Sequence, residues 1–204
     1  MAVTLTTPNT LLGALQPKGD AARLATNLAT VVIGTLLLTF AAKINVPVWP
    51  VPVTLQTFAV AALSAAFGWR IGVATVVLYL LEGASGLPVF ATGGGAAYLL
   101  GPTGGFLVSW LLMAYIIGRA ADLGAGNRPF ALFGAMLLAD AVQFVFGFLW
   151  LLALASQASW IDQASPIASA YHGAVQPFLV WDILKMGLAA LTVTGAWQLL
   201  KRKS

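Results

Sequence analysis

Long runs of apolar residues, separated by short polar, proline-rich or glycine-rich segments, make up most of the chain. A helix needs about 20 predominantly apolar residues to cross a bilayer, with a range of roughly 17 to 25. The second run is short and follows three prolines, so we expect its helix to be tilted or partly buried in protein. The runs predict six membrane-spanning helices, at Leu24–Ala42, Thr54–Gly68, Ile71–Leu87, Thr103–Ala121, Phe130–Leu154 and Ala174–Leu200.

The composition agrees with a location in the membrane. Of the 204 residues, 60% are hydrophobic and only 8% are charged, whereas about a quarter of a soluble domain is charged. The mean hydropathy is +0.91. We therefore expect an all-α, multi-pass protein of the plasma membrane, surrounded by lipid, with residues 1–204 forming a single membrane domain. Within it, residues 24–200 form the six-helix bundle.

The basic residues predict the orientation of the bundle. With six spans, Lys43 is the basic residue of the outer loops and Lys185 lies inside the last span. Lys and Arg gather on the cytoplasmic side of membrane proteins. Both termini are therefore expected in the cytoplasm, with residues 1–22 and 201–204 as cytoplasmic segments. The other basic residues all fall on that side: Lys18, Arg23, Arg70, Arg119, Arg128, Lys201, Arg202 and Lys203.

Several kinds of chemistry are excluded by residue types. The chain has no cysteine and one histidine, His172, so we expect no thiolate or multi-histidine metal site and no cofactor. The basic residues form no stripe with interleaved aromatic residues, which argues against binding of nucleic acid. The chain contains no GxxxxGK[ST] motif, so it does not hydrolyse ATP through a P-loop of its own.

Two outer loops have unusual composition. Residues 43–53 contain three prolines, and residues 88–102 contain a run of three glycines. Irregular backbone near membrane depth persists only where it is buried in protein or lines a cavity. We interpret both loops as lids over a pocket that opens outward. The alternative is packing against lipid headgroups, with Trp49 as an interfacial anchor. The ligand-binding candidates from these loops are Trp49, Phe90, Gly93, Gly94, Gly95 and Tyr98.

Two charged residues lie inside the last apolar run. Asp182 and Lys185 are three residues apart, so they share one face of a helix. A charge at the bilayer centre costs roughly 2.5 to 3.5 kcal/mol, so the pair should face the bundle interior. It can serve as an ion pair that holds helices together or as a polar anchor for a ligand. Gln56 lies just below the proline-rich loop and is a further ligand-binding candidate.

Other polar residues within the spans leave alternatives open. Asp140 and Gln143 share a helix face, and hydrogen bonds between helices are their simplest role. Asp140 and Glu82 can instead be the protonatable groups of a self-sufficient, ion-coupled carrier. A third hypothesis is an intramembrane serine protease. Its nucleophile would be Ser85 of the motif GASG, and its base would be His172, which is expected in a loop. Such a short motif is expected by chance in this chain.

Small residues mark one face of the first predicted helix. Ala25 and Ala29 have the spacing that lets a second transmembrane helix approach closely. The spacing is common by chance in alanine-rich spans. It nevertheless makes these two residues candidates for binding a partner protein.

Four motifs in order resemble the BioY family. They are VPVTLQT at 51–57, GLPVFATGGG at 86–95, YLLGPTGGF at 98–106 and WDILKMGLA at 181–189. Members of that family are the biotin-binding S components of energy-coupling factor (ECF) transporters. The resemblance extends over nearly the whole chain. It departs from the family pattern at Asp140, where an apolar residue is expected.

The resemblance implies a six-helix membrane protein that captures biotin from outside and is not an enzyme. It implies a transmembrane T subunit and two cytoplasmic ATPase subunits as partners, with Ala25 and Ala29 matching the T-subunit contact on the first helix. An Asp and a Lys of the last helix are associated with biotin in the family, and they match Asp182 and Lys185. Which end of biotin meets this pair does not follow from the sequence.

Overall fold

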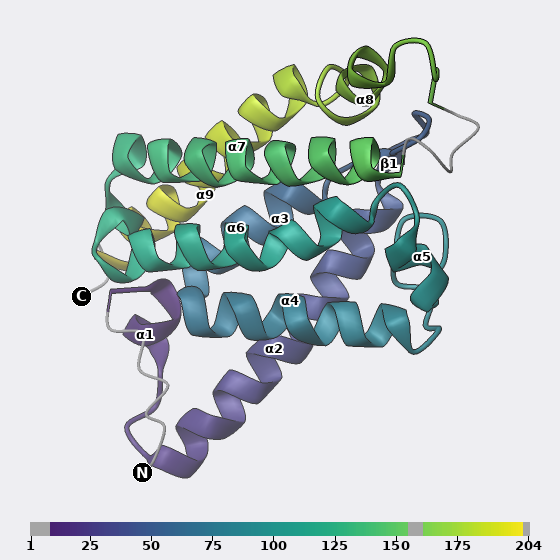
Figure 1. Ribbon diagram of the computed structural model, residues 1–204. Helices are drawn as coiled ribbons and strands as arrows, with labels where there is room; N and C mark the ends of the chain where they lie inside the picture. Colours follow the sequence, from purple (N-terminus) through teal and green to yellow (C-terminus); the bar gives the residue numbers. More distant parts are fainter. Residues whose placement is uncertain (1–8, 155–160, 202–204) are drawn as a thin grey trace.

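The computed structural model describes residues 9–154 and 161–201, and Figure 1 shows their arrangement. The predicted segments within residues 1–8 and 202–204, with Arg202 and Lys203, lie outside the described residues. The elements in chain order are α1 (Leu11–Leu15), α2 (Asp20–Lys43), β1 (Asn45–Val46), β2 (Val53–Thr54), α3 (Gln56–Phe67), α4 (Trp69–Ala84), α5 (Ala96–Leu100), α6 (Gly104–Asp122), the 3-10 helix η1 (Ala125–Asn127), α7 (Pro129–Ala153), α8 (Pro166–Ala174) and α9 (Leu179–Lys201).

Within the described residues, helices fall in each of the six predicted runs: α2, α3, α4, α6, α7 and α9. α2 begins earlier than predicted, at Asp20, and this acidic residue in the first turn complements the helix dipole. Lys43 complements the dipole in the last turn. The predicted start of the sixth span at Ala174 is wrong. Residues 175–178 separate α8 from α9, because Pro177 disfavours helix at the residue before it.

The structure supports part of the predicted membrane topology. Within the described residues, four segments are long and apolar enough to cross a membrane: Asp20–Lys43, Gly104–Asp122, Pro129–Ala153 and Pro166–Lys201. α3 has 12 residues and α4 has 16, so they extend only about 18 and 24 Å, against a hydrocarbon core of about 30 Å. α3 contacts α2, α4, α6 and α9. Its short length agrees with a position largely buried in protein.

The elements divide between two ends of the bundle (Figure 1). The β1–β2 hairpin, α5 and α8 lie at one end, and α1 lies at the other end with the last turns of α9. In the hairpin, Asn45 pairs with Thr54 and Val46 with Val53 in antiparallel register. A connection of residues 47–52 joins the strands. The proline-rich loop is therefore an ordered hairpin at the end that also holds α5.

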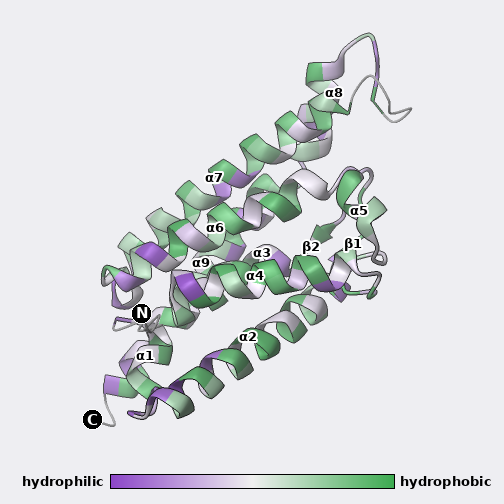
Figure 2. Cartoon of the chain, turned by 60° about the horizontal axis from the view of Figure 1, so that its bottom comes forward, coloured by the Kyte–Doolittle hydropathy of each residue, from purple (hydrophilic) through white to green (hydrophobic). Residues whose placement is uncertain are grey.

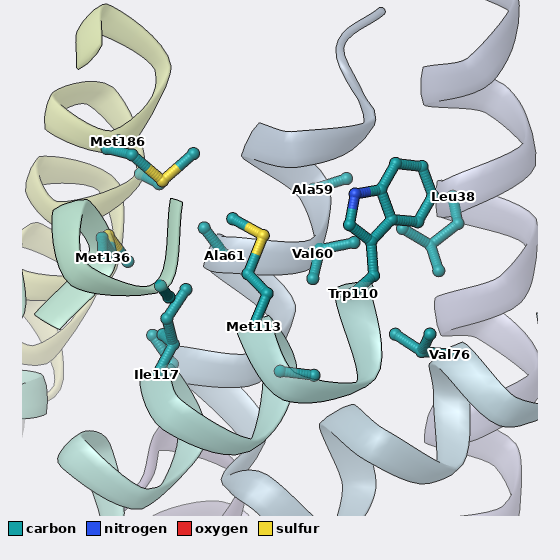
Figure 3. Packing of buried hydrophobic residues seen from close by; sticks show 14 of the residues in the cluster. Leu38, Ala59, Val60, Ala61, Val76, Trp110, Met113, Ile117, Met136 and Met186 are labelled. Carbon is teal, nitrogen blue, oxygen red and sulfur yellow. The ribbon is translucent and has the colours of Figure 1, made fainter. Parts of the chain in front are cut away.

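The apolar core is built around α3 and α6 (Figure 3). α3 presents the small residues Ala59, Val60 and Ala61, and α6 presents the larger Trp110 and Met113, all buried. Small residues allow helix backbones to approach closely, which is the main source of packing energy inside a membrane. Other members of the same cluster are Leu38, Val76, Ile117, Met136 and Met186.

The outer surface of the helices is strongly apolar. Figure 2 shows hydrophobic residues along most of the length of α2 and α7. Monomeric soluble proteins rarely expose apolar patches of this extent. The surface therefore fits contact with lipid chains. Exposed large residues on α2 and α9 include Leu24, Leu28, Val32, Leu36, Phe40, Val180, Leu184, Leu188 and Leu191.

Candidate functional site

A small cavity lies between α3, α6, α7 and α9, below the β1–β2 hairpin and the segment that precedes α5. Its polar side is formed by Gln56, Thr57, Gln143, Asp182 and Lys185. Its apolar side is formed by Val51, Pro52, Phe90, Tyr98, Phe106, Leu107, Trp110 and Phe178. A mostly apolar cavity with a few convergent polar groups is typical of a site for a small organic ligand.

Asp182 and Lys185 form a buried ion pair on the side of α9 that faces the bundle, as their spacing predicts. Asp182 is 1% exposed. Its Oδ1 accepts from Lys185 Nζ and, at 2.9 Å, from Thr57 Oγ1. Lys185 Nζ also donates to the Thr54 carbonyl at 2.8 Å and to Thr57 Oγ1 at 3.2 Å. The end of β2 and the first turn of α3 therefore hold the pair in place.

A second set of polar side chains meets the other oxygen of Asp182. Nε2 of Gln143 lies 3.5 Å from Asp182 Oδ2 and 3.0 Å from Asp140 Oδ1. Nε1 of Trp110 donates to Gln143 Oε1 at 2.8 Å. Gln143 thus links α6 to α9, as the interpretation of hydrogen bonds between helices expects. Asp140 bonds to Gln143 on its own helix, and it is not among the residues that line the cavity.

Aromatic rings close the cavity at its outer end. The rings of Phe90 and Tyr98 stack with centroids 4.8 Å apart, and Tyr79 meets Phe90 edge-on. The Phe90 ring lies against Gly83 of α4, where a Cβ atom would come within 1.9 Å of it. Tyr79 accepts from Gln56 Nε2 at 2.6 Å and donates to the Val89 carbonyl at 2.9 Å. Phe90 and Tyr98 form the outer wall of the cavity, which we call its roof. Through Tyr79 and Gly83, the roof is held against α3 and α4.

The glycine run shapes this roof without lining the cavity. Gly93 and Gly95 have φ of 148° and 102°, in the region that favours glycine. A Cβ atom on Gly94 would lie 2.0 Å from the Leu87 carbonyl oxygen. The turn returns the chain to α4, where Gly95 N–H donates to the Gly83 carbonyl at 2.7 Å. The three glycines, predicted to contact a ligand, are absent from the residues that line the cavity.

Lys43 ties the roof to the end of α2. Its Nζ donates to the carbonyls of Pro88 and Phe90, at 2.8 and 2.6 Å. The loop that carries Phe90 is thus held by α2 as well as by α4. Sequence reasoning assigned Lys43 no role beyond its position in an outer loop, because a lysine that binds backbone carbonyls leaves no motif.

The free space in the cavity is small, about 40 Å³, whereas pockets for organic ligands measure about 300 to 1,000 Å³. A neighbouring, more open space of about 420 Å³ lies under the hairpin and shares Pro52, Tyr98 and Thr103 with the cavity. Trp49 lines this outer space and is 73% exposed.

The residues of the alternative functions lie apart from the cavity lining. Glu82 accepts from Thr35 Oγ1 at 3.1 Å, on the side of α4 that faces α2. Ser85 is exposed and bonds to the Glu82 carbonyl, and His172 pairs with Gln176. His172 lies in α8, where a loop was expected. Among the described residues, no cluster of His, Asp or Glu suited to a metal ion occurs.

Ala25 and Ala29 lie on the exposed side of α2 and do not line the cavity. Their neighbours on that side, Leu28 and Val32, are 59% and 50% exposed. This placement agrees with the expectation of an outward-facing strip of small residues.

Sequence reasoning missed several residues of the cavity. Thr57, which bonds both Asp182 and Lys185, follows the predicted Gln56 directly and was not singled out. Trp110, Phe106 and Phe178 lie within or beside long apolar runs. Aromatic residues are common throughout such runs, so no local signal separates a cavity wall from an ordinary core residue. The packing of α6 against α7 and of α7 against α9, with the ring contact between Phe106 and Phe178, brings them together.

The fold and the cavity define a helical membrane protein with a small, mostly apolar cavity near one end of the bundle, into which a few polar side chains converge. The sequence matches the BioY family over residues 12–202. The biotin transporter BioY of Thermotoga maritima is 36% identical over 160 residues, which cover 78% of this chain and 88% of that protein. A probable biotin transporter BioY of Pyrococcus horikoshii is 32% identical over 168 residues, covering 82% and 93%.

A solved structure has the same fold. It is a crystal structure at 2.1 Å of the S-component for biotin from an ECF-type ABC transporter, and it matches with a TM-score of 0.73 at 21% identity, covering 89% of this chain and 95% of that one. The chain belongs to the BioY family. This is a family of transport proteins and not of enzymes, so the alternative of an intramembrane protease is wrong.

Proposed function

We propose that the protein is the biotin-binding S component of an ECF transporter and captures biotin from outside the cell. The observation that carries the proposal is the buried Asp182–Lys185 pair beneath the stacked rings of Phe90 and Tyr98, in a chain whose relatives are named biotin transporters. Two charges kept in an apolar bundle are a functional feature by default, and a polar ligand inside the membrane gives them a role.

The chemistry of the cavity suits biotin. Its ureido ring carries two N–H donors beside a carbonyl, and Asp182 offers a carboxylate that accepts N–H groups. Its sulfur-containing ring is apolar and suits the wall formed by Phe106, Trp110 and Phe178. In a dry cavity each satisfied hydrogen bond is stronger and each unmade one more costly. We infer that Gln56, Tyr98 and Trp49 contact the rest of the ligand as it enters.

The proposal includes six spans with both termini in the cytoplasm and a multi-pass position in the plasma membrane. α3 and α4 are short spans supported by their neighbours. Arg23, Arg70, Arg119 and Arg128 belong to the end of the bundle opposite the hairpin, by their positions at the ends of α2, α4, α6 and α7, which agrees with the cytoplasmic side. Residues 1–204 act as one membrane domain whose apolar surface contacts lipid.

Energy for uptake comes from partners. We infer that a T subunit in the membrane and two cytoplasmic ATPases bind this protein, with Ala25 and Ala29 of α2 at the contact with the T subunit. Small exposed residues there permit close approach of another helix. The ion-coupled alternative lacks comparable support, because Glu82 and Asp140 belong to separate hydrogen-bond networks among the described residues.

The test of ligand identity uses the purified wild-type protein in detergent. We expect one biotin per chain by titration calorimetry, and native mass spectrometry should detect the protein–biotin complex. Because burial of apolar surface on binding lowers the heat capacity, the binding enthalpy should become more negative as temperature rises. Absence of biotin binding by folded, monodisperse protein would refute the proposed function.

The orientation has a direct test, because the natural chain contains no cysteine. Two exposed positions are suitable, Ala164 before α8 and Asn127 in η1. In right-side-out membrane vesicles, a membrane-impermeant maleimide should label the Ala164→Cys variant and should reach Asn127→Cys only after the vesicles are opened. Equal labelling of both in sealed vesicles would overturn the six-span arrangement.

A further inference from the structure

Gln143 lies at the centre of a hydrogen-bonded chain that joins α6, α7 and α9 beside the cavity. It is 1% exposed and lines the cavity with Trp110 and Asp182. The orientation of its amide follows from chemistry. The indole N–H of Trp110 can only donate, so it must face the amide oxygen, 2.8 Å away. The amide nitrogen is then left facing the carboxylates of Asp140 and Asp182.

All three N–H donors of the Lys185 ammonium group already have acceptors. An ammonium group has three N–H donors, and those of Lys185 have three acceptors: the Thr54 carbonyl, Thr57 Oγ1 and Asp182 Oδ1. A ligand carbonyl that bound Lys185 would have to displace one of them. The donor for a ligand carbonyl is therefore best sought elsewhere in the cavity.

The weakest hydrogen bond of this network is the one between Gln143 and Asp182. Oδ1 of Asp182 accepts from two groups, whereas Oδ2 has, among the described residues, the single contact with Gln143 Nε2 at 3.5 Å. That distance is beyond the usual 2.7 to 3.2 Å range. Oδ2 and Nε2 are thus an acceptor and a donor, side by side on the cavity wall, that are held close but poorly bonded to each other.

We propose that Gln143 is a specificity-determining residue that donates from Nε2 to the ring carbonyl of the ligand, while the adjacent Oδ2 of Asp182 accepts the ring N–H. The inference rests on the proposed function. In a cyclic urea the C=O and each N–H point outward from one edge of the ring, so they present an acceptor beside a donor. The pair formed by Asp182 and Gln143 is complementary to that edge.

Trp110 and Asp140 are positioning residues in this arrangement. Trp110 holds the amide oxygen of Gln143 and Asp140 accepts one N–H of Nε2, so the second N–H is directed to the ligand. A donor that is already oriented loses little conformational freedom on binding. This gives Asp140, which departs from the pattern expected for the family, a role without contact to the ligand.

The test compares biotin with its imino analogue, in which the ring carbonyl is replaced by C=NH, a donor when protonated. Wild type should prefer biotin by roughly 100-fold, because a site built to donate rejects a ligand that also donates. Gln143→Glu replaces the donor by an acceptor of the same shape and should shrink that preference to below about tenfold or reverse it. Dissociation constants from titration calorimetry give the ratio of the two affinities.

A second variant keeps the inference falsifiable if Gln143→Glu does not fold. Trp110→Phe retains an aromatic wall but removes the N–H, so the amide of Gln143 is free to turn and the preference for biotin should fall by about tenfold. Ser109→Ala is the matched control, because Ser109 is buried on the same helix and its hydroxyl donates to the Phe106 carbonyl of that helix. It should change neither affinity.

The outcomes separate the inference from the proposed function. Wild type that binds no biotin contradicts the proposed function itself. Wild type that binds biotin, with a preference that Gln143→Glu and Trp110→Phe leave unchanged, overturns the role of Gln143 alone. Loss of affinity for both ligands by the same factor would also overturn it, because a merely structural residue would act equally on both.

Discussion

Asp182→Asn is expected to weaken biotin binding by at least about 100-fold, which corresponds to about 2.7 kcal/mol. The side chain keeps its size but loses one acceptor. Thr57 and Lys185 both donate to Oδ1, so the amide oxygen of the asparagine should take that position. Its NH₂ group would then replace Oδ2 and would face Gln143 Nε2 and the ligand N–H. Three donors would meet where an acceptor is needed.

Part of the effect of Asp182→Asn must be separated from folding. Breaking a buried ion pair by removing one partner costs roughly 3 to 5 kcal/mol, because the other charge stays buried. The double variant Asp182→Asn with Lys185→Met removes the unpaired cation. Its thermal stability should return toward the wild-type value, while its affinity should stay at least about tenfold below wild type, since a neutral amide is a weaker acceptor than a carboxylate.

The measurements are titration calorimetry for affinity and thermal unfolding for stability. Thr194→Val is the control on the same helix, because Thr194 is buried far along α9 and bonds to the Ala190 carbonyl of its own helix. It should leave binding unchanged. A folded Asp182→Asn variant with wild-type affinity would remove Asp182 from the site. Full recovery of affinity in the double variant would mean that Asp182 acts only through Lys185.

The pairing of Asp182 with Lys185 could be predicted because it depends on local geometry and on one strong energy. Residues three apart on a helix share a face whatever the rest of the fold does. The cost of a charge in lipid then requires that face to point inward. The outward side of Ala25 and Ala29 was expected from their spacing, which suits close approach of a partner helix, and both residues are exposed on α2.

The partners of Gln143 could not be predicted in this way. Trp110 and Asp182 are 33 and 39 residues away from it, so their meeting depends on how three helices rotate about their axes against one another. Weak amphipathicity makes that rotation hard to infer, because both the core and the lipid are apolar. The glycine run illustrates another limit. Its sequence is the same whether backbone NH groups bind a ligand or merely form a tight turn.

The break between α8 and α9 had a visible signal that the apolar run concealed. Pro177 lies within the run assigned to the sixth span, and a proline disfavours helix at the preceding residue. Hydrophobicity decides whether a segment enters the membrane, while the backbone decides where the helix begins. α9 begins at Leu179, so Asp182 falls in its first turn, near the hairpin end of the bundle where the cavity lies.

Ala25→Leu combined with Ala29→Leu is expected to abolish most biotin uptake while leaving biotin affinity within about twofold of wild type. Neither residue lines the cavity, so no ligand contact changes. Leucine is also a good helix former, so α2 should stay intact. Two larger side chains on the strip would hold a partner helix away from the backbone of α2, which removes the close packing on which helix association in membranes depends.

A matched control is available on another exposed helix. Ala131 and Gly134 are exposed on α7, and a Cβ atom on Gly134 would meet no atom within 4 Å. Ala131→Leu with Gly134→Leu therefore adds similar bulk to the lipid-facing surface away from α2. This variant should retain uptake if the T subunit binds at α2, and a loss of uptake equal to that of the α2 variant would show that added bulk alone is harmful.

Three measurements on the α2 variant decide its interpretation. Affinity for biotin is measured on the purified protein, uptake in cells that also make the T subunit and the ATPases, and complex formation by co-purification of the T subunit. We expect normal affinity, uptake reduced at least about tenfold, and a weakened complex, because a lost helix contact of 1 to 2 kcal/mol shifts association by roughly that factor.

If affinity collapses while the complex persists, α2 communicates with the cavity, and the contacts of Lys43 with the roof are the physical route to examine. If neither changes, the small residues of α2 contact only lipid, and the surface for the T subunit lies on another helix.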